Sequence, residues 1–417
     1  MLAPSFAPQR RREAITAILL ALNVFVLLTT YYVLKVVREP LILLDGGAEV
    51  KAYASAGQAM LLVAVVPAFG ALAARTSRIQ LLTVVQLFFV GCLALFYVLA
   101  RAHVPIGIPF YLWVGVFNVL VVSNFWSFAN DIYTAEQGKR LFGAIGLGGS
   151  VGAIVGALVP GLLHRYIGTY ELMLAAAGGL VLSTAIYGVV DRAAPRPARA
   201  PERMSKAGGF ELVRRDRYLG LVALMVVIAT IVNTTGEFVV GSLVAEASAA
   251  ASDPGGYIES FYSSYYGAVN IVSALVQGLL VARVLGRLGV RGALFVMPLV
   301  ALGGWLAFAA SSTVAMIRVT KTAENSVDYS LHNTVRQALF LPTSRDAKYQ
   351  GKAAIDTFFF RIADMIAGLG IVYVLVHVLG AGVRGFAITN LALTVAWLAI
   401  VARTGKLHDA LAAEQRP

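Results

Sequence analysis

Charged side chains interrupt four of the long apolar stretches of this sequence. Lys35, Arg38 and Glu39 close the first stretch, and Glu237 lies with Asn233 inside the seventh. A charge at membrane depth costs about 2.5–3.5 kcal/mol on insertion scales, so it usually faces a wet cavity or a charged partner. Arginine binds phosphate or carboxylate oxygens with a planar fork, and lysine acts as a compact point charge. These residue types therefore predict that the protein binds a small anionic solute.

The tenth stretch carries a regular row of polar residues, with intervals of three, four, four and four positions. Its members are Lys321, Glu324, Asp328, His332 and Arg336. This spacing predicts one face of a helix. We expect that face to line an aqueous cavity between two halves of the molecule. An amphipathic surface helix, a re-entrant loop and a structural ion-pair ladder are the alternatives.

The eleventh stretch holds a second mixed cluster, made of Lys352, Asp356, Arg361 and Asp364. Because the two aspartates flank Arg361, part of this cluster can neutralise itself. Lys352 stands near the start of the stretch and can alternatively extend its stem so that the ammonium reaches the membrane surface.

The composition requires a lipid environment. Of the 417 residues 59% are hydrophobic and 13% are charged, and the mean hydropathy is +0.77. Soluble domains are about 45–50% apolar and about 25% charged. About twelve segments reach the length of a membrane span, and spans of this kind are helices. They are residues 15–37, 51–74, 79–100, 106–129, 141–163, 170–190, 218–247, 257–284, 290–310, 312–341, 352–379 and 384–403. The sequence thus predicts an all-α, multi-pass integral membrane protein embedded in the lipid bilayer.

The net charge of +12 follows from the positive-inside rule rather than from a nucleic-acid partner. With a cytoplasmic amino terminus, most basic residues fall in inside loops, for example Arg75, Lys139 and Arg345. The outside loops are short or acidic, with Asp253 and Glu259 after the seventh segment. We therefore expect both termini to be cytoplasmic. No cleavable signal peptide is expected, because the first apolar run is too long.

A basic linker at residues 191–217 divides the chain into six-segment halves, residues 1–190 and 218–417. This is the layout of the major facilitator architecture. We find no motif for a soluble domain, a phosphate-binding loop or a metal site, and Cys92 is the only cysteine. We expect neither an enzyme nor an ATP-driven pump, no cofactor and no metal, and a monomer.

Glycines recur every four residues in the fifth segment, at Gly148, Gly152 and Gly156. Such spacing is typical of a seam where two helices approach closely. The simple interpretation is tight helix packing, and a stronger one is a surface on which the two halves rock.

Three stretches resemble the ATP/ADP translocases, the nucleotide transporters of plastids and obligate intracellular bacteria. LKVVREPLIL at 34–43 is similar to that family's first-span motif. Residues 111–152 are similar to its fourth and fifth spans, and residues 328–356, which end in GKAAID, to its tenth and eleventh. Residues 232–244 carry a weaker likeness. The resemblance implies a twelve-helix carrier that exchanges nucleotides across a membrane, here the inner membrane of a bacterium.

The resemblance also implies site residues. The family's first-span lysine, seventh-span glutamate and eleventh-span lysine fall on Arg38, Glu237 and Lys352. Two positions depart from the pattern: Tyr111 replaces an acidic residue, and Asp328 replaces a basic one. Our candidate substrate-binding residues are Lys35, Arg38, Tyr111, Asn233, Glu237, Lys321, Asp328, His332, Arg336, Lys352, Asp356 and Arg361.

The sequence therefore favours a secondary transporter of nucleotides or related phosphorylated anions. A proton-coupled carrier of another solute and a non-transporting sensor or scaffold remain alternatives. We expect Arg38 and Lys352 to face one pathway from opposite halves. Glu39 would orient the Arg38 side chain or neutralise part of its charge, and Pro40 would break or kink the helix. Alternatively, the three charged residues of the first cluster lie in the headgroup zone. Glu237 has no basic residue nearby in sequence, so its partner must come from elsewhere, such as Arg38 or Lys352, unless it titrates or caps a helix broken near Gly236.

Overall fold

The computed structural model describes residues 6–73, 75–133, 135–164, 166–193, 209–344 and 346–414. Within these ranges the regular structure is entirely helical. The first part contains α1 (Phe6–Ala73), α2 (Arg78–Arg101), α3 (Gly107–Ile132), α4 (Ala135–Leu163) and α5 (Glu171–Ala193). The second contains α6 (Gly209–Arg215), α7 (Arg217–Ser248), α8 (Pro254–Leu279), α9 (Val281–Ala293), α10 (Val296–Ala310), α11 (Val314–Val327), α12 (Asn333–Ala338), α13 (Lys352–Ala354), α14 (Phe360–Met365) and α15 (Val383–Glu414). Five π-helical pieces complete it: η1 (Asp328–His332), η2 (Ala347–Gly351), η3 (Ile355–Phe359), η4 (Ile366–Val372) and η5 (Val374–Val378).

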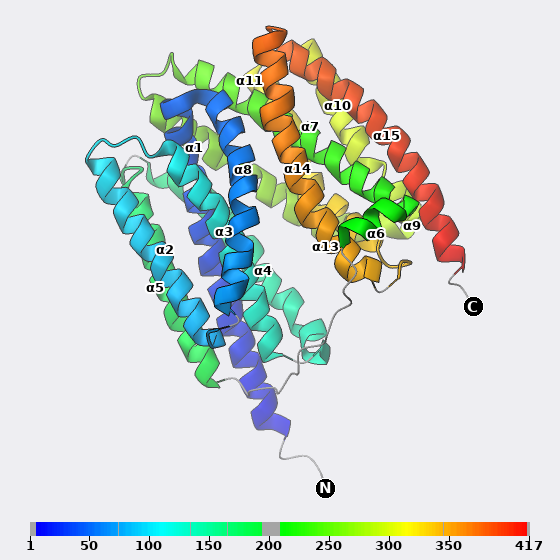
Figure 1. The fold of residues 1–417 in the computed structure, drawn as a ribbon. Helices are drawn as coiled ribbons and strands as arrows, with labels where there is room; N and C mark the ends of the chain where they lie inside the picture. The colour runs from blue at the N-terminus through cyan, green and yellow to red at the C-terminus, as the bar shows by residue number, and fades with distance from the viewer. Residues whose placement is uncertain are drawn as a thin grey trace. The chain divides into compact units, whose positions relative to one another are not determined.

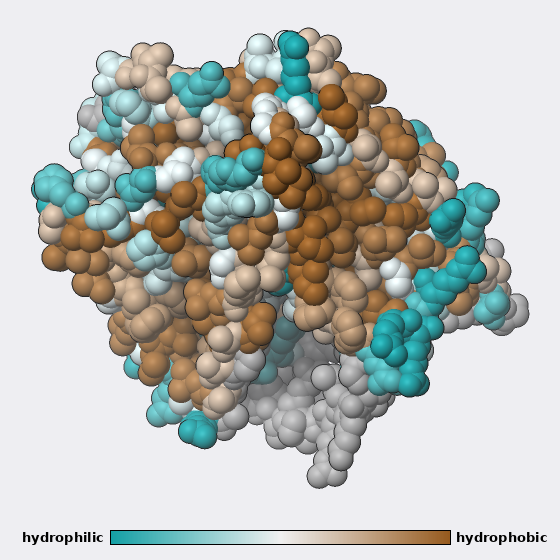
Figure 2. All heavy atoms as spheres, turned by 45° about the horizontal axis from the view of Figure 1, so that its top comes forward, coloured by the Kyte–Doolittle hydropathy of each residue, from teal (hydrophilic) through white to brown (hydrophobic). Residues whose placement is uncertain are grey.

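Membrane-spanning length and apolar composition are common among these helices. In the described ranges, 8 helices can cross a membrane, or 9 if α8 and α9, bent by 74°, are counted together. The long α1 holds the first two predicted segments, and α10 and α11–α12 hold the ninth and tenth. Hydrophobic residues cover most of the face seen in Figure 2. The predicted all-α membrane class is confirmed by this architecture, and the transporter-type fold by the structural likenesses given below.

The break in α1 is at Gly47 and not at Pro40. Gly47 has φ 72° and ψ −175°, and it is the residue with non-helical dihedrals inside α1. Glycine adopts positive φ without the steric cost that a Cβ would impose. Of the two predicted effects of Pro40, a break is therefore wrong, and a kink at Pro40 stays a prediction. A membrane helix tolerates the loss of the one backbone hydrogen bond that proline cannot donate.

Segment boundaries also differ from the prediction around α8 and α9. The predicted eighth segment, 257–284, ends earlier, at Leu279, where the chain turns into α9. Gly289, with φ 64°, breaks α9 just before the predicted ninth segment. The predicted linker is partly helical, because α5 reaches Ala193 and α6 begins at Gly209; residues 194–208 lie outside the described ranges, as does Arg345.

The chain forms two compact units. Unit 1 comprises residues 1–45, 61–201 and 251–267, and unit 2 comprises residues 46–60, 202–250 and 268–417. In unit 1, α2 lies beside α5 (Figure 1), and the core includes Phe89, Phe117 and Trp113. In unit 2, α15 packs on α7 and α10 (Figure 1), over the fully buried Trp305 and Trp397.

The glycine seam of α4 packs against α1 within unit 1. A Cβ on Gly148 would lie 2.2 Å from the carbonyl oxygen of Ala21, and one on Gly152 would lie 2.4 Å from that of Phe25. Gly156 meets Thr29 in the same way, at 2.3 Å. The tight-packing interpretation is confirmed. The stronger interpretation is wrong for this seam, because its partner helix belongs to the same unit.

Candidate functional site

The first-span charges form one cluster in unit 1, together with two tyrosines. Arg38 donates from Nε to Glu39 Oε1 at 3.1 Å, and Tyr266 donates its hydroxyl to the same oxygen at 3.0 Å. The Glu39 side chain is 0% exposed and that of Arg38 is 12% exposed. Both side chains are therefore packed inside the protein rather than exposed on its surface. Glu39 thus contacts Arg38, as both of its predicted roles require.

Aromatic faces contact both cations of this cluster. The Arg38 guanidinium carbon lies 4.5 Å from the ring centroid of Tyr111, and Lys35 Nζ lies 4.1 Å from that of Tyr266. Lys35 also lies 5.1 Å from the ring of Tyr32. Cations are attracted to the negative face of an aromatic ring. Tyr111 therefore supports Arg38 by stacking, where the translocase pattern has an acid.

The terminal amino groups of Arg38 have no hydrogen-bond partner among the residues that the structure describes. The Nε atom is used by Glu39, and the ring of Tyr111 covers one face of the guanidinium. The fork of the guanidinium remains available for the bidentate contact that carboxylate and phosphate oxygens accept. This local arrangement suits an anion.

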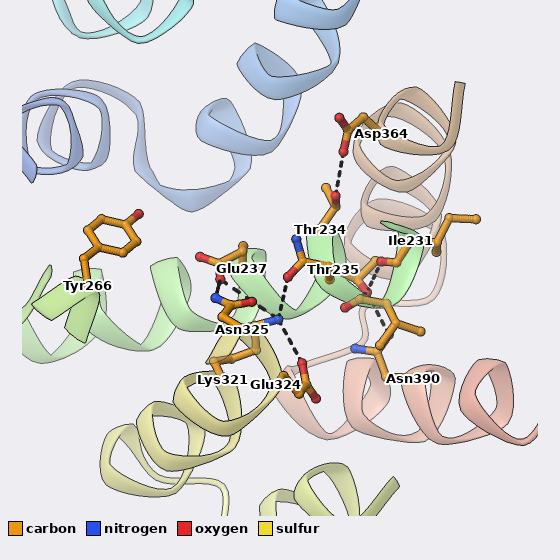
Figure 3. Close-up of polar contacts among 12 residues, drawn as sticks. Ile231, Thr234, Thr235, Glu237, Tyr266, Lys321, Glu324, Asn325, Asp364 and Asn390 are labelled. Atoms are coloured by element: carbon orange, nitrogen blue, oxygen red, sulfur yellow. Dashed lines mark hydrogen bonds and ion pairs between the residues drawn. The ribbon is translucent and has the colours of Figure 1, made fainter. Parts of the chain in front are cut away.

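A second network joins α7 and α11 in unit 2 (Figure 3). Lys321 is 0% exposed, and its Nζ donates to Asn233 Oδ1 and Glu324 Oε2, each at 2.9 Å. Glu237 Oε1 lies 4.0 Å from Nζ and accepts a hydrogen bond from Asn325 Nδ2 at 3.0 Å. Lys321 is therefore a cationic neighbour of Glu237 within this unit.

The helix around Glu237 is continuous, because α7 runs without a break from Arg217 to Ser248. The alternative that Glu237 caps a broken helix is therefore wrong. Gly236 lets the lysine approach, since a Cβ there would lie 3.1 Å from Lys321 Cδ and Nζ. Asn233 and Glu237, four residues apart, both reach Lys321 as their shared helical face predicts.

The polar residues of the tenth segment do not form one continuous row of ion pairs. Lys321, Glu324 and His332 are buried, at 0%, 1% and 3% exposure, so a surface helix is wrong. The π-helical piece η1 shifts the helical phase after Val327. One rung of the proposed ion-pair ladder forms, between Lys321 and Glu324. His332 instead packs its ring edge against Trp397.

Arg336 and Lys352 share one carboxylate. Arg336 lies 3.6 Å from Asp356 Oδ1, and Lys352 lies 3.2 Å from Asp356 Oδ2. The side chains are 23%, 31% and 23% exposed for Arg336, Lys352 and Asp356, respectively. Lys352 thus has a partner within its own unit and need not reach for the surface. The group carries a formal charge of +1, from two cations and one carboxylate.

Arg361 belongs to a separate pair. It lies 3.7 Å from Asp364, which accepts a hydrogen bond from Thr234 Oγ1 at 2.7 Å. The predicted self-neutralisation therefore occurs between Arg361 and Asp364, whereas Asp356 serves Arg336 and Lys352. Asp328 is half-buried at the start of η1. The structure thus divides the candidate residues among several clusters.

Sequence reasoning missed Tyr266 and Asn325. Tyr266 belongs to the aromatic run FYSSYY at 261–266, which suggested nothing beyond an apolar helix. Asn325 stands one position from the row that was counted at intervals of three and four. A helical face that includes neighbours of the row would have indicated Asn325, but no local pattern pairs Tyr266 with Glu39.

The fold and these buried charged clusters define a multi-pass membrane protein with a transporter-type fold. No protein-family model matches the chain. By sequence it is 24% identical over 342 residues to the ADP,ATP carrier protein 1 of Chlamydia trachomatis serovar D, covering 71% of this chain and 64% of that protein. It is 26% identical over 343 residues to the ADP,ATP carrier protein 1 of Chlamydia pneumoniae, covering 71% and 66%. The carrier of the same name in Rickettsia bellii is 22% identical over 288 residues, covering 59% and 57%.

The resemblance to the ATP/ADP translocases is therefore confirmed in curated bacterial relatives, although the chain spans less than two thirds of their length. Solved transporters share the fold. A bacterial homologue of the iron transporter ferroportin has a TM-score of 0.67 at 12% identity, covering 94% of this chain and 99% of that one. The nucleoside transporter NupG has a TM-score of 0.65 at 10% identity, covering 95% and 99%. A bacterial homologue of the lysosomal transporter Spinster has a TM-score of 0.63 at 14% identity, covering 97% and 98%.

Proposed function

We propose that the protein is a secondary transporter that moves nucleotides or related phosphorylated anions by alternating access. The observation that carries the proposal is the buried Arg38, whose guanidinium rests on Tyr111 and keeps its terminal amino groups available. An arginine that is already oriented loses little conformational freedom when it binds an oxyanion. The names of the bacterial relatives make a nucleotide the first substrate to test.

Each unit contributes a cationic cluster to this proposal. Lys35 and Arg38 exceed Glu39 by one charge in unit 1, and Arg336 and Lys352 exceed Asp356 by one in unit 2. Phosphorylated solutes carry several negative charges, which clusters of this kind compensate. We propose the Arg38 cluster as the anion contact of unit 1 and the Arg336–Lys352 cluster as that of unit 2. Glu237, Asn233 and Lys321 are further candidate contacts within unit 2, and Asp328, His332 and Arg361 are the remaining candidates.

The departures from the translocase pattern concern specificity. Tyr111 removes a negative charge beside Arg38, and Asp328 adds one to the tenth segment. We infer that the charge balance of the site differs from that of the relatives. Binding of ATP or ADP in particular is therefore proposed separately from binding of phosphorylated anions in general. A bacterial inner-membrane location, cytoplasmic termini and a monomeric state complete the proposal.

Proton-coupled transport is a second candidate, favoured by the carboxylates next to a buried lysine. Glu237 and Glu324 both lie within 4.0 Å of Lys321 Nζ. Intramembrane carboxylates often serve as proton relays in transporters. Under this alternative the transported solute need not be a nucleotide.

Uptake by purified protein in liposomes tests the proposal. Labelled ATP, inorganic phosphate and a sugar phosphate would be supplied outside, with and without unlabelled substrate inside. We expect uptake of at least one phosphorylated anion, accelerated by internal substrate and insensitive to an uncoupler. Uptake that collapses with the uncoupler would support proton coupling. No flux of any of these solutes would contradict the proposal and favour a sensor or scaffold.

A further inference from the structure

His164 lies between two carboxylates in unit 1. It follows the end of α4, and its Nε2 lies 3.1 Å from Asp253 Oδ2. Its other ring nitrogen, Nδ1, lies 3.7 Å from Glu259 Oε1. Glu259 lies at the start of the eighth predicted segment and Asp253 just before it, in the other half of the sequence.

The two carboxylates suit the doubly protonated form of this imidazole. A neutral imidazole donates from one nitrogen and presents a lone pair at the other, where it would oppose a carboxylate oxygen. In the structure, His164 Nδ1 and Glu259 Oε1 are buried and lack a hydrogen bond. Glu259 is 0% exposed and its other oxygen accepts a hydrogen bond from Thr169 Oγ1 at 2.6 Å. A proton on Nδ1 would place a positive charge 3.7 Å from Glu259 Oε1, which is an ion-pair distance.

An equivalent contact occurs in unit 2. His377, in η5, contacts Glu49 in the second part of α1 through Nε2. The same Glu49 oxygen accepts a hydrogen bond from Tyr53 at 2.7 Å, and the ring of Tyr373 lies 5.0 Å from that of His377. Protonation of His377 would convert this contact into a charged pair.

The two histidines occupy corresponding places in the two halves of the sequence. Each lies at the end of the fifth predicted segment of its half, at residues 141–163 and 352–379. Each contacts a carboxylate near the start of the second predicted segment of the other half. Parallel structural repeats of this kind relate the halves of major facilitator carriers. The repetition makes an accidental surface contact a poor explanation.

The carboxylates that contact the histidines lie in two segments that each belong to the opposite unit from the rest of their half of the sequence. Residues 46–60 lie in unit 2 and residues 251–267 lie in unit 1. These segments are closely packed: a Cβ on Gly368 would lie 2.6 Å from the carbonyl oxygen of Ala52, and Ser263 donates to the carbonyl oxygen of Ala157 at 2.7 Å. Each histidine therefore lies where one of these two segments packs against the unit that contains it, which we call its host unit.

We propose that His164 and His377 are two proton-binding latches that hold segments 251–267 and 46–60 against their host units. Acidification strengthens both contacts, and alkaline pH releases them. Histidine changes its charge between about pH 5 and 8, so the latches respond to the pH at the segment ends predicted to face outside. Their ligand is the proton, and the proposal does not depend on what the carrier transports.

Other titratable groups near the latches do not replace the histidines. Around His164, the described neighbours are Asp253, just before α8, and Glu259 within α8. Glu171 at the start of α5 pairs with Arg101 at 3.8 Å. Around His377 they are Glu49, Tyr53 and Tyr373.

Hydrogen–deuterium exchange on the full chain in lipid nanodiscs tests the latches without a substrate. Exchange of segments 46–60 and 251–267 would be compared at about pH 5.5 and about pH 8, after correction for intrinsic exchange. We expect slower exchange at the lower pH, by about two- to fivefold for each segment, as for a partly exposed ion pair. The pH effect should disappear from one segment in His164→Gln and from the other in His377→Gln.

The matched control is His103→Asn, because His103 is an exposed turn residue with φ 59° that asparagine tolerates. It should retain the pH effect in both segments. Wild-type exchange that is equal at the two pH values would overturn the proposal. So would a pH effect that persists in both glutamine variants, provided that their melting temperatures match the wild type.

Discussion

At the scale of the residue, the structure explains why charges occur in apolar helices. Arg38 and Lys321 each contact a carboxylate one to three positions away. Each also contacts a group from a distant helix, the Tyr111 ring for Arg38 and Asn233 for Lys321. A buried charge that loses its partner is strongly destabilised, by about 3–5 kcal/mol. These residues therefore contribute to folding as well as to any binding, and tests of function must separate the two.

Replacing Arg38 by lysine separates charge from geometry. Arg38→Lys keeps a cation opposite Glu39 but removes the fork and most of the stacking on Tyr111. Charge-assisted hydrogen bonds contribute about 1.5–3 kcal/mol, so we expect affinity for a phosphorylated substrate to fall about 10- to 150-fold. Isothermal titration with ATP, or with the anion found in the uptake screen, measures this. The control is Arg101→Lys at an exposed pair, and equal affinity in the two variants would refute the role of Arg38.

Glu237 and Glu324 should respond differently to loss of charge. Glu237→Gln can still accept the hydrogen bond of Asn325, and Lys321 keeps Glu324 at 2.9 Å. We therefore expect a folded variant whose transport is abolished or whose dependence on pH is lost. Glu324→Gln instead removes the nearest anion from a buried ammonium and should lower stability by about 3–5 kcal/mol. Thermal unfolding and uptake of both variants distinguish these outcomes, and wild-type transport with unchanged pH dependence in Glu237→Gln would exclude its role.

At the scale of the element, close helix packing in unit 1 depends on the absence of a side chain at three glycines. Thr29 also donates from Oγ1 to the Gly152 carbonyl oxygen at 3.2 Å. Gly152→Ala forces α1 and α4 apart, because the new Cβ would lie 2.4 Å from a backbone oxygen. Overpacking of this kind costs about 1–3 kcal/mol.

The matched control lies on the same helix. A Cβ on Gly143 would meet nothing within 4 Å, so Gly143→Ala should be neutral or stabilising through its helix propensity. Melting temperatures of the two variants in one detergent measure the difference. Equal melting temperatures would show that the seam relaxes at no cost.

At the scale of the whole molecule, the positive-inside pattern predicts the orientation of the chain in the membrane. In a Cys92→Ser background, a cysteine at Ser205 in the linker should react with an impermeant thiol reagent only after the membrane is opened. A cysteine at Ser252, between α7 and α8, should react in intact cells. Labelling of the linker in intact cells would reverse the orientation, and with it the side on which the histidine latches sense pH.

The sequence by itself determined the helical membrane class, the approximate segments, the glycine seam and the presence of charges within apolar helices. These are local properties, because they follow from composition and from the 3.6-residue period of a helix. The tertiary structure decided the partners: Lys321 with Asn233 across 88 positions, Glu39 with Tyr266 across 227 and Glu49 with His377 across 328. It also decided that α1 breaks at Gly47 rather than at Pro40. No local period encodes which distant helices pack together, since that choice depends on how all of their side chains fit at once.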